Sequence, residues 1–216
     1  MAFYTESQKH LQEQFETTTL ASALEATIIV DELDERHSAF IASRDFFFLS
    51  TVTAAGEPTV SYKGGDVGTV KVIDSRTLAF PAYDGNGMFL SMGNIADTAK
   101  IGMLFIDFET PNRVRVQATA SFSADDDLLN EYPGAIGVVR ASVDQAFVNC
   151  ARYIHKHTRV APSRYVPDAD GAQPHATWKR IDGLQPFLSA DDQARTDTEG
   201  QITMEEYADR LAAGES

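Results

Sequence analysis

The fold is decided by the stretch from Phe46 to Phe122, which opens with Phe46-Phe47-Phe48-Leu49-Ser50-Thr51-Val52. Six short segments within it are rich in β-branched or aromatic residues and are bounded by Gly, Pro, Asn or Asp, as is typical of strands. They cover residues 46–52, 59–63, 69–73, 77–80, 101–106 and 114–118. Tight turns can join antiparallel strands, whereas parallel strands need long crossovers. The close spacing therefore predicts a six-stranded antiparallel meander that closes into a small barrel.

The pattern changes between the fourth and the fifth predicted strand. The intervening sequence is Asp84-Gly85-Asn86-Gly87-Met88-Phe89-Leu90-Ser91-Met92-Gly93-Asn94, which is too polar and too rich in glycine for a core strand. We expect a short helix over residues 88–92 and a second helical fragment over residues 94–100. A ligand site is expected at such an irregular polar insertion, because binding groups are often carried by loops on a rigid scaffold.

Helices are predicted before the strands. Gln8 to Ala26 carries apolar residues at mixed three-to-four spacing, which indicates a helix that is interrupted near residues 17–19. Residues 31–42 place acidic side chains in a first turn and apolar ones behind them, as expected for a short helix whose dipole is complemented. We expect this second helix to pack against the barrel.

The sequence after the barrel predicts a mixture of elements. Residues 135–142 group β-branched side chains and could form a further strand. Asp144 to His157 places apolar residues at helical spacing and predicts a helix, for which Ser142 and Gln145 would form the capping box. Residues 159–183 are typical of a loop region. A capping box that starts at Thr203 predicts a short terminal helix.

Length and composition favour one globular domain. The chain has 216 residues, of which 43% are hydrophobic and 23% are charged, so it can bury a substantial core. We therefore expect residues 1–216 to form a single, mainly β domain with peripheral helices. Its predicted parts are a helical N-terminal segment (residues 1–44), the barrel (about 45–142), and a helical and loop segment (143–216).

The charge and the termini exclude several classes of function. The formal charge of −14 would repel phosphate backbones, so nucleic acid is not an expected partner. The first ten residues lack a basic segment followed by an apolar run, which a signal peptide would have. A membrane span needs about 18 apolar residues, and no stretch of the sequence approaches that length. Cys150 is the only cysteine, so no intramolecular disulfide can form, and we expect its thiol to be buried as a small hydrophobe. A cytoplasmic protein is the default expectation.

The first candidate site is a glycine-rich break between two predicted strands. Its residues are Ser61, Lys63, Gly64, Gly65, Gly68 and Lys71. Glycines let backbone N–H groups approach an anion closely, and lysines supply positive charge, so the segment suits a phosphate. The spacing matches neither the P-loop nor the dinucleotide fingerprint. A β-bulge or a wide hairpin with solvated lysines is an equally good reading of this segment alone.

The second candidate site is the polar insertion. Asn86, Ser91 and Asn94 offer hydrogen-bonding side chains there, and three glycines permit close approach of the backbone. A helix that starts near Met88 would also direct N–H groups toward an anion. The two candidate segments could therefore converge on one ligand. The alternative for this segment is a surface loop that ends in a capped helix.

Two arginines and an amide share one face of a predicted strand. Arg113, Arg115 and Gln117 follow one another at a spacing of two, which puts their side chains on the same side. They could meet an anionic ligand in the barrel groove, although a solvated strand face is the commoner meaning of such a pattern.

Metal and nucleophile patterns are weak. His155 and His157 lie two residues apart and would not share a helix face, so a zinc pair is not expected. Cys150 and His155 lack any spacing that requires a nucleophile and its base to meet. Residues 197–206 have the glycine, isoleucine and final glutamate of a calcium loop, but Arg195 falls at the first ligand position and would oppose a cation. We predict no metal site.

Taken in order, several motifs resemble those of the pyridoxamine 5'-phosphate oxidase-like, flavin-binding split-barrel family. The segments are residues 46–52, Gly56-Glu57-Pro58, Ser61-Tyr62-Lys63-Gly64-Gly65, Leu78-Ala79-Phe80-Pro81, Asp84-Gly85-Asn86, Ser91-Met92-Gly93-Asn94-Ile95, and 102–108. Each motif is weak alone, but their order and spacing are fairly specific. The resemblance extends from about Leu11 to Ile154.

The resemblance implies a six-stranded split barrel that dimerises and binds one FMN in each groove between the subunits. Carried over by position, the residues that would hold the flavin phosphate are Ser61, Lys63, Gly64, Lys71, Asn86, Ser91 and Asn94. The implied function is an FMN-dependent oxidoreductase that takes electrons from a nicotinamide donor or a small-molecule substrate. The resemblance identifies no catalytic side chain.

Two departures from the family pattern limit what can be carried over. The oxidase itself has basic residues where Ser91-Met92-Gly93-Asn94 stands, and it has an arginine-containing C-terminal segment that has no counterpart after Trp178. Both departures argue against oxidation of pyridoxamine phosphate. The alternatives are a deazaflavin- or haem-binding member of the same fold, a non-catalytic flavin-binding or sensing protein, and a barrel adaptor without a cofactor.

Overall fold

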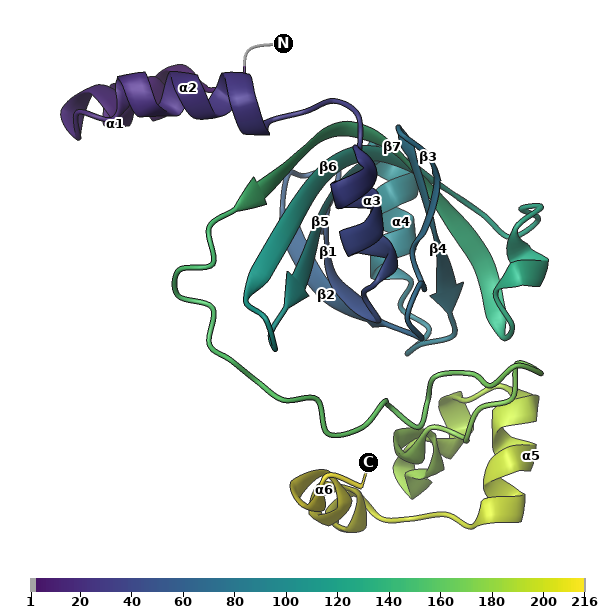
Figure 1. Cartoon of the computed structure of the whole chain (residues 1–216). Helices are drawn as coiled ribbons and strands as arrows, with labels where there is room; N and C mark the ends of the chain where they lie inside the picture. The colour runs from purple at the N-terminus through teal and green to yellow at the C-terminus, as the bar shows by residue number, and fades with distance from the viewer. Residues whose placement is uncertain (1–2, 216) are drawn as a thin grey trace. The chain divides into compact units, whose positions relative to one another are not determined.

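The structure is a computed structural model that describes residues 3–215. The chain divides into two compact units, Met1–Ser163 and Arg164–Ser216. The first unit contains the whole sheet together with the helices α1 to α4 (Figure 1). Each unit is described below by itself.

One antiparallel sheet organises the first unit. In the described part of the chain it has seven strands in the order β2-β1-β5-β6-β7-β4-β3. The strands are β1 Phe46–Val52, β2 Pro58–Gly64, β3 Lys71–Asp74, β4 Thr77–Tyr83, β5 Lys100–Asp107, β6 Asn112–Ser123 and β7 Ala135–Asn149. The six predicted strands and their antiparallel orientation are confirmed. The predicted meander is wrong, because β1 pairs with β5 and β4 pairs with β7, whereas β2–β3 and β4–β5 are not paired. The predicted number is also wrong, because β7 is a full member of the sheet. Closure of the sheet into a split barrel stays a prediction.

The strand β7 replaces a predicted helix. It continues through Asn149 and pairs with β6 along most of its length and with β4 along its first half. Ala146, which lies within the predicted helix, is buried in the sheet's core, as is Val143 just before it. Pairing with strands far away in the sequence overrides the local helical spacing here. Cys150 follows the strand and is exposed, so the prediction of a buried thiol is also wrong.

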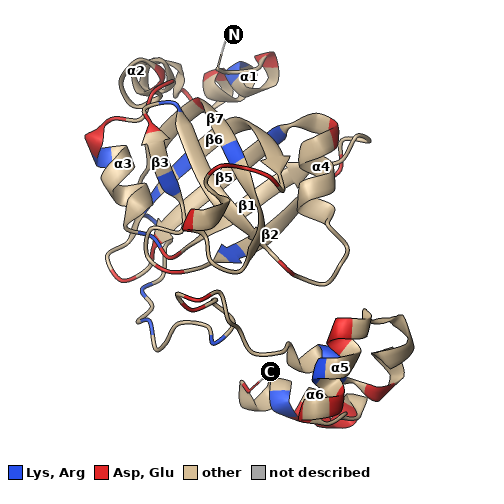
Figure 2. Ribbon diagram, turned by 90° about the vertical axis from the view of Figure 1, so that its right-hand side faces the viewer, with Lys and Arg blue, Asp and Glu red and all other residues tan. Residues whose placement is uncertain are grey.

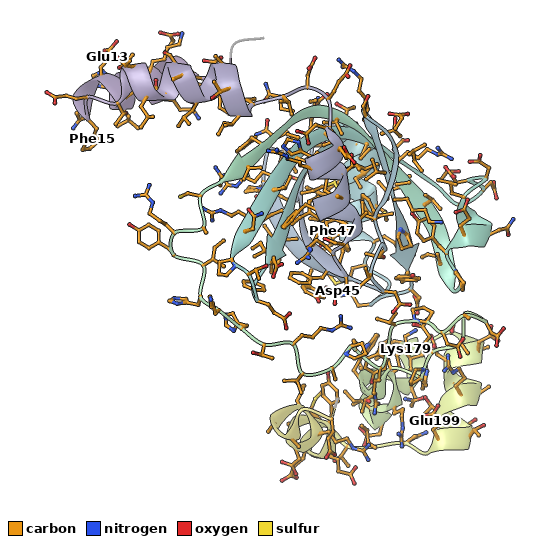
Figure 3. The ribbon with its side chains drawn as sticks, in the orientation of Figure 1. Glu13, Phe15, Asp45, Phe47, Lys179 and Glu199 are labelled. Carbon is orange, nitrogen blue, oxygen red and sulfur yellow. The ribbon has the colours of Figure 1, made fainter. Side chains whose placement is uncertain are left out.

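The core lies on one face of this sheet. Phe47 is 1% exposed, and its ring packs 5.0 Å from Phe80 and 5.4 Å from Phe105 between ring centroids. On β1, buried residues alternate with partly exposed ones, which gives the strand an inner and an outer face. The side chain of Phe47 points into the unit in Figure 3. The alternating burial of β1 therefore places Phe47 in the core.

Three helices precede the sheet, as predicted. They are α1 Glu6–Gln14, α2 Thr18–Ile28 and α3 Glu35–Ala42. A capping box at Thr5 starts α1, and the Asp34 side chain caps α3. The predicted interruption near residues 17–19 is confirmed as the break between α1 and α2. Only α3 contributes a fully buried core residue, Ile41.

The second unit is a small helical body. It contains two 3-10 helices, Thr177–Arg180 and Asp182–Phe187, followed by α5 Ala190–Glu199 and α6 Met204–Ala213. The Lys179 ammonium lies 3.0 Å from an Asp192 carboxylate oxygen, and both groups are largely shielded from solvent. The capping box at Thr203 is confirmed. Within residues 3–215, no cluster of three His, Cys, Asp or Glu side chains could hold a metal, and no helix is long and apolar enough to cross a membrane.

An ion pair gives the sheet a pH-dependent contribution. Arg140 on β7 donates to both carboxylate oxygens of Asp126, at 2.6 and 2.8 Å, and this contact lowers the pKa of Asp126 from 3.8 to about 2. Because the folded-state pKa is the lower one, the contribution is present above about pH 4 and is lost as the pH falls toward 2. Asp126→Asn should therefore reduce the unfolding free energy at pH 7. Urea titrations of the wild type and the variant at pH 7 and near pH 2 measure this. The difference in unfolding free energy between the two proteins should be smaller near pH 2, and an equal difference at both pH values would contradict the prediction.

Candidate functional site

The helix α4 Leu90–Thr98 is fixed onto the hairpin of β1 and β2 by polar side chains. The Asn94 amide donates to the Thr51 hydroxyl at 2.9 Å, and the Thr98 hydroxyl donates to the Val52 carbonyl at 3.0 Å. The two predicted helical fragments are thus wrong, because one continuous helix spans them. It begins after Phe89, which has a left-handed backbone (φ 50°) that turns the chain sharply into the helix.

The two candidate segments meet at a pair of serines. The hydroxyl oxygens of Ser61 on β2 and Ser91 on α4 lie 3.3 Å apart, although 30 residues separate them in the sequence. The predicted convergence of the segments is confirmed at this contact. Their role in holding a cofactor stays a prediction.

Lys63 lies two residues beyond Ser61 on β2, so the two side chains share one face of the strand. Its side chain is partly buried, and this desolvation lowers the pKa of its amine. Within the described part of the chain, no hydrogen bond or ion pair satisfies the Lys63 ammonium. A partly desolvated cation without a counter-ion is energetically unfavourable, and an anionic ligand would relieve that cost.

The glycine-rich break next to Lys63 is a tight turn. Gly65 donates its N–H to the Asp45 carbonyl at 2.8 Å, and an added Cβ would lie 2.4 Å from the Thr69 hydroxyl oxygen. At Gly64 an added Cβ would lie 2.8 Å from the ring of Tyr62, which can move aside. Gly65 is therefore required by packing, whereas the space beside Gly64 is occupied by the Tyr62 ring.

Two predicted site residues have other contacts. Lys71 forms an ion pair with Glu131, and its ammonium lies 5.0 Å from the centroid of the Tyr132 ring. The exposed Asn86 side chain accepts a hydrogen bond from the Met88 N–H at 3.1 Å. Neither residue contacts the serine pair, and a neutralised Lys71 has less charge to offer a ligand than Lys63 has.

Sequence reasoning missed the threonines that support the site. Thr51 and Thr59 face each other across the β1–β2 hairpin, and their hydroxyl oxygens lie 2.9 Å apart. The Asn94 amide reaches this pair, so Asn94 is buried between helix and hairpin and acts as the link between them. The hairpin turn at residues 54–58 could have indicated this threonine pair from the sequence, because the turn places Thr51 opposite Thr59.

The predicted pair of arginines lies on the outer face of the sheet, opposite the core. Strand pairing places five residues side by side there, which we call the outer row. Its members are Tyr62, Phe48, Leu104, Arg115 and Phe147, one from each of β2, β1, β5, β6 and β7. Arg115 is exposed, and Tyr62 is 61% exposed. Arg115 thus lies across the sheet from the face that carries Ser61 and Lys63.

The arrangement can bind an anion but offers no evident reactive group. Two hydroxyls meet at the junction of β2 and α4, and a partly buried lysine, Lys63, follows on the same face of β2. No cysteine, histidine or carboxylate among the described residues contacts the serine pair, so an activated nucleophile is not formed there. Any redox chemistry at this site would have to come from a bound group.

Comparisons with known proteins identify the family. A sequence profile described as pyridoxamine 5'-phosphate oxidase matches residues 33–148, more than half of the chain. No curated protein matches the chain. Several solved structures resemble it. One is a proposed pyridoxamine 5'-phosphate oxidase from Lactobacillus delbrueckii, with 27% identity and a TM-score of 0.44 over 55% of this chain and 95% of that one.

Two further structures resemble the chain. HutZ, described as a heme storage protein from Vibrio cholerae, is 21% identical, with a TM-score of 0.41 over 54% of this chain and 94% of that one. An FMN-binding protein from Syntrophomonas wolfei is 15% identical, with a TM-score of 0.40 over 65% of this chain and 97% of that one. All three TM-scores lie below 0.5, so the assignment rests on the profile match. The chain belongs to the pyridoxamine 5'-phosphate oxidase family.

Proposed function

We propose that this protein binds FMN and acts as an FMN-dependent oxidoreductase. The observation that supports this most is the hydroxyl pair of Ser61 and Ser91 next to Lys63, a lysine that no described residue neutralises. A phosphate monoester is bound by hydrogen-bond donors and positive charge. The junction of β2 and α4 supplies two hydroxyl donors, and Lys63 supplies one cation. Membership of a family named after a phosphate-bearing substrate is consistent with such a site.

The residues present fit the phosphate of the cofactor. Lys63 would supply charge, Ser61 and Ser91 would donate hydrogen bonds, and Asn94 would hold α4 in place through Thr51. When bound, the flavin ring carries electrons or hydride, and the protein contributes binding and orientation. We assign no acid or base among the side chains.

We also propose that the protein works as a homodimer. The strand β2 lies at an edge of the sheet, and its outward residues Val60 and Tyr62 are 69% and 61% exposed. The Tyr62 ring continues into an aromatic cluster, because Phe46 stacks on it at 5.3 Å and on Phe108 at 5.8 Å. An exposed aromatic edge of this kind is typical of a protein interface.

An absorbance spectrum of the purified protein, followed by anaerobic reduction, tests the proposed activity. We expect a flavin spectrum, release of FMN on denaturation, and bleaching by NADPH, NADH or a candidate substrate. A haem spectrum, a deazaflavin, or a colourless protein without affinity for added FMN would overturn FMN binding. Bound FMN that no donor reduces would instead support a flavin carrier.

The pH dependence of FMN binding should report on Lys63. Burial lowers the pKa of its amine below the ordinary 10.5, so the ammonium is lost at a lower pH than in an exposed lysine. The phosphate is fully charged only above about pH 6. Affinity should therefore rise to a plateau above about pH 6 and fall again on the alkaline side. Fluorescence titrations from pH 5 to 10 measure this, and the alkaline fall should be absent in Lys63→Ala.

A further inference from the structure

The N-terminal helices form a projecting arm. We call residues 3–30 the arm. Both of its ends are attached to β7, because the Phe3 ring packs 5.8 Å from the Phe147 ring and Val30 pairs with Ala146 through two backbone hydrogen bonds. Glu13 and Phe15, near the turn between α1 and α2, lie at the end of the arm farthest from the sheet (Figure 3). The arm is thus a helical hairpin anchored at its base.

The arm has almost no core of its own. Ala21 is the only buried residue in α1 and α2. Leu11, Phe15 and Leu20 are 51%, 67% and 59% exposed, and Leu24 is 39% exposed. Isolated helices shorter than about 12 residues are marginal in water, and α1 and α2 have 9 and 11 residues. Such a hairpin needs another surface to cover its apolar side chains.

The charges of the arm indicate what that surface carries. Residues 3–30 contain four glutamates and one lysine, whereas β6 contains Arg113 and Arg115 and no acidic residue. Figure 2 shows acidic positions on α1 and basic positions along the sheet. An acidic, apolar arm is complementary to a basic, apolar strand face.

The outer row offers such a face. Its last member, Phe147, is already covered by Phe3 at the base of the same chain's arm and is 8% exposed. Its neighbours Arg115, Leu104, Phe48 and Tyr62 continue across the sheet and are exposed or partly exposed. The arm extends about 15 Å from its base, given a rise of 1.5 Å per residue. Its tip points away from its own sheet in Figure 1, so it is placed to meet another molecule.

We propose that the arm docks on the outer row of a second copy of the chain, next to Arg115, and that two arms are exchanged in the homodimer. This inference rests on the proposed homodimer and extends it by naming the segment that covers the partner. A two-fold axis makes the exchange reciprocal, since each chain carries both an arm and a row. The leucines and Phe15 of the arm supply the apolar contact, and its glutamates face the arginines of the partner's β6.

Sedimentation velocity and FMN titration of three proteins test the proposal. The wild type should be a dimer. The variant Phe15→Asp/Leu20→Asp places charge on exposed apolar positions and should raise the dissociation constant of the dimer about tenfold or more. The matched control, Gln14→Asp/Thr19→Asp, adds the same two charges at exposed polar positions and should raise it much less. Circular dichroism checks that all three fold alike.

A cross-link between chains tests the geometry directly. Phe15→Cys and Tyr62→Cys are made on separate, differently tagged chains in a Cys150→Ser background and are co-expressed. A short bismaleimide should link the two tags, and Gln14→Cys in place of Phe15→Cys should link them less. An unlinked dimer, or a dimer unaffected by Phe15→Asp/Leu20→Asp, would overturn arm exchange alone. A monomeric wild type would overturn the homodimer as well, while the FMN titration reports separately on the cofactor.

Discussion

Lys63→Ala is expected to weaken FMN binding about 10- to 100-fold. A hydrogen bond to a charged group contributes about 1.5–3 kcal/mol, and Lys63 has no other counter-ion among the described residues that could compete for its ammonium. Because the side chain is partly shielded from water, the loss should lie well above that of a surface ion pair, which is about 1 kcal/mol or less. Equilibrium titration of the apoprotein with FMN, monitored by quenching of flavin fluorescence, gives the ratio.

Lys71→Ala is the matched control for this prediction. Its ammonium is already paired with Glu131 and lies over the Tyr132 ring, so its removal should change FMN affinity by no more than about threefold. Lys63→Arg should retain most of the affinity because it keeps the charge. Equal losses for Lys63→Ala and Lys71→Ala would show that both lysines serve the ligand and that the Glu131 pair opens on binding.

Phe47→Ala is expected to destabilise the first unit by about 3–5 kcal/mol, the range for removing a fully buried phenylalanine. The ring is 1% exposed and packs against Phe80 and Phe105, so its loss leaves a cavity that rigid strands cannot close. For a unit of this size the melting temperature should fall by about 10 °C or more. Thermal and urea unfolding, each followed by circular dichroism, measure the change.

Phe187→Ala is the control, since that ring is 82% exposed and should contribute little. A loss below about 1 kcal/mol for Phe47→Ala would mean that the centre of the core lies elsewhere. The two variants remove the same side chain, once at a buried position of the first unit and once at an exposed position of the second.

Local patterns predicted most of the sheet. The segment 46–52 becomes β1 without change, because its aromatic and β-branched content is visible within seven positions. The strand β7 was only partly predicted, since it pairs with β6 and β4, and the strand spacing of its second half is not visible locally. Phe147 fits the spacing of a helix as well as that of a strand, and only its pairing with Arg115 across the sheet decides between the two. Longer-range pairing is the information that a single sequence lacks.

The same division applies to the site. Ser61 and Ser91 were predicted to converge, because a polar insertion and a glycine-rich break suggested one ligand. The partner of Lys71 was not predictable, since Glu131 lies 60 residues further along the chain. The support that Asn94 receives from Thr51 depends on hairpin register as well as helix position. The residue types indicated which side chains could bind an anion. The fold determined that Lys71 is already paired with Glu131, whereas Lys63 has no counter-ion among the described residues.

The central claim is that Ser61, Ser91 and Lys63 hold the flavin phosphate, and comparing FMN with riboflavin tests it most directly. The two ligands differ only in that phosphate. The account predicts that the apoprotein binds FMN at least about tenfold more tightly than riboflavin, and that Lys63→Ala removes most of this difference by lowering FMN affinity alone. Equal affinities for the two ligands, or a preference for FMN that survives in Lys63→Ala, would contradict it.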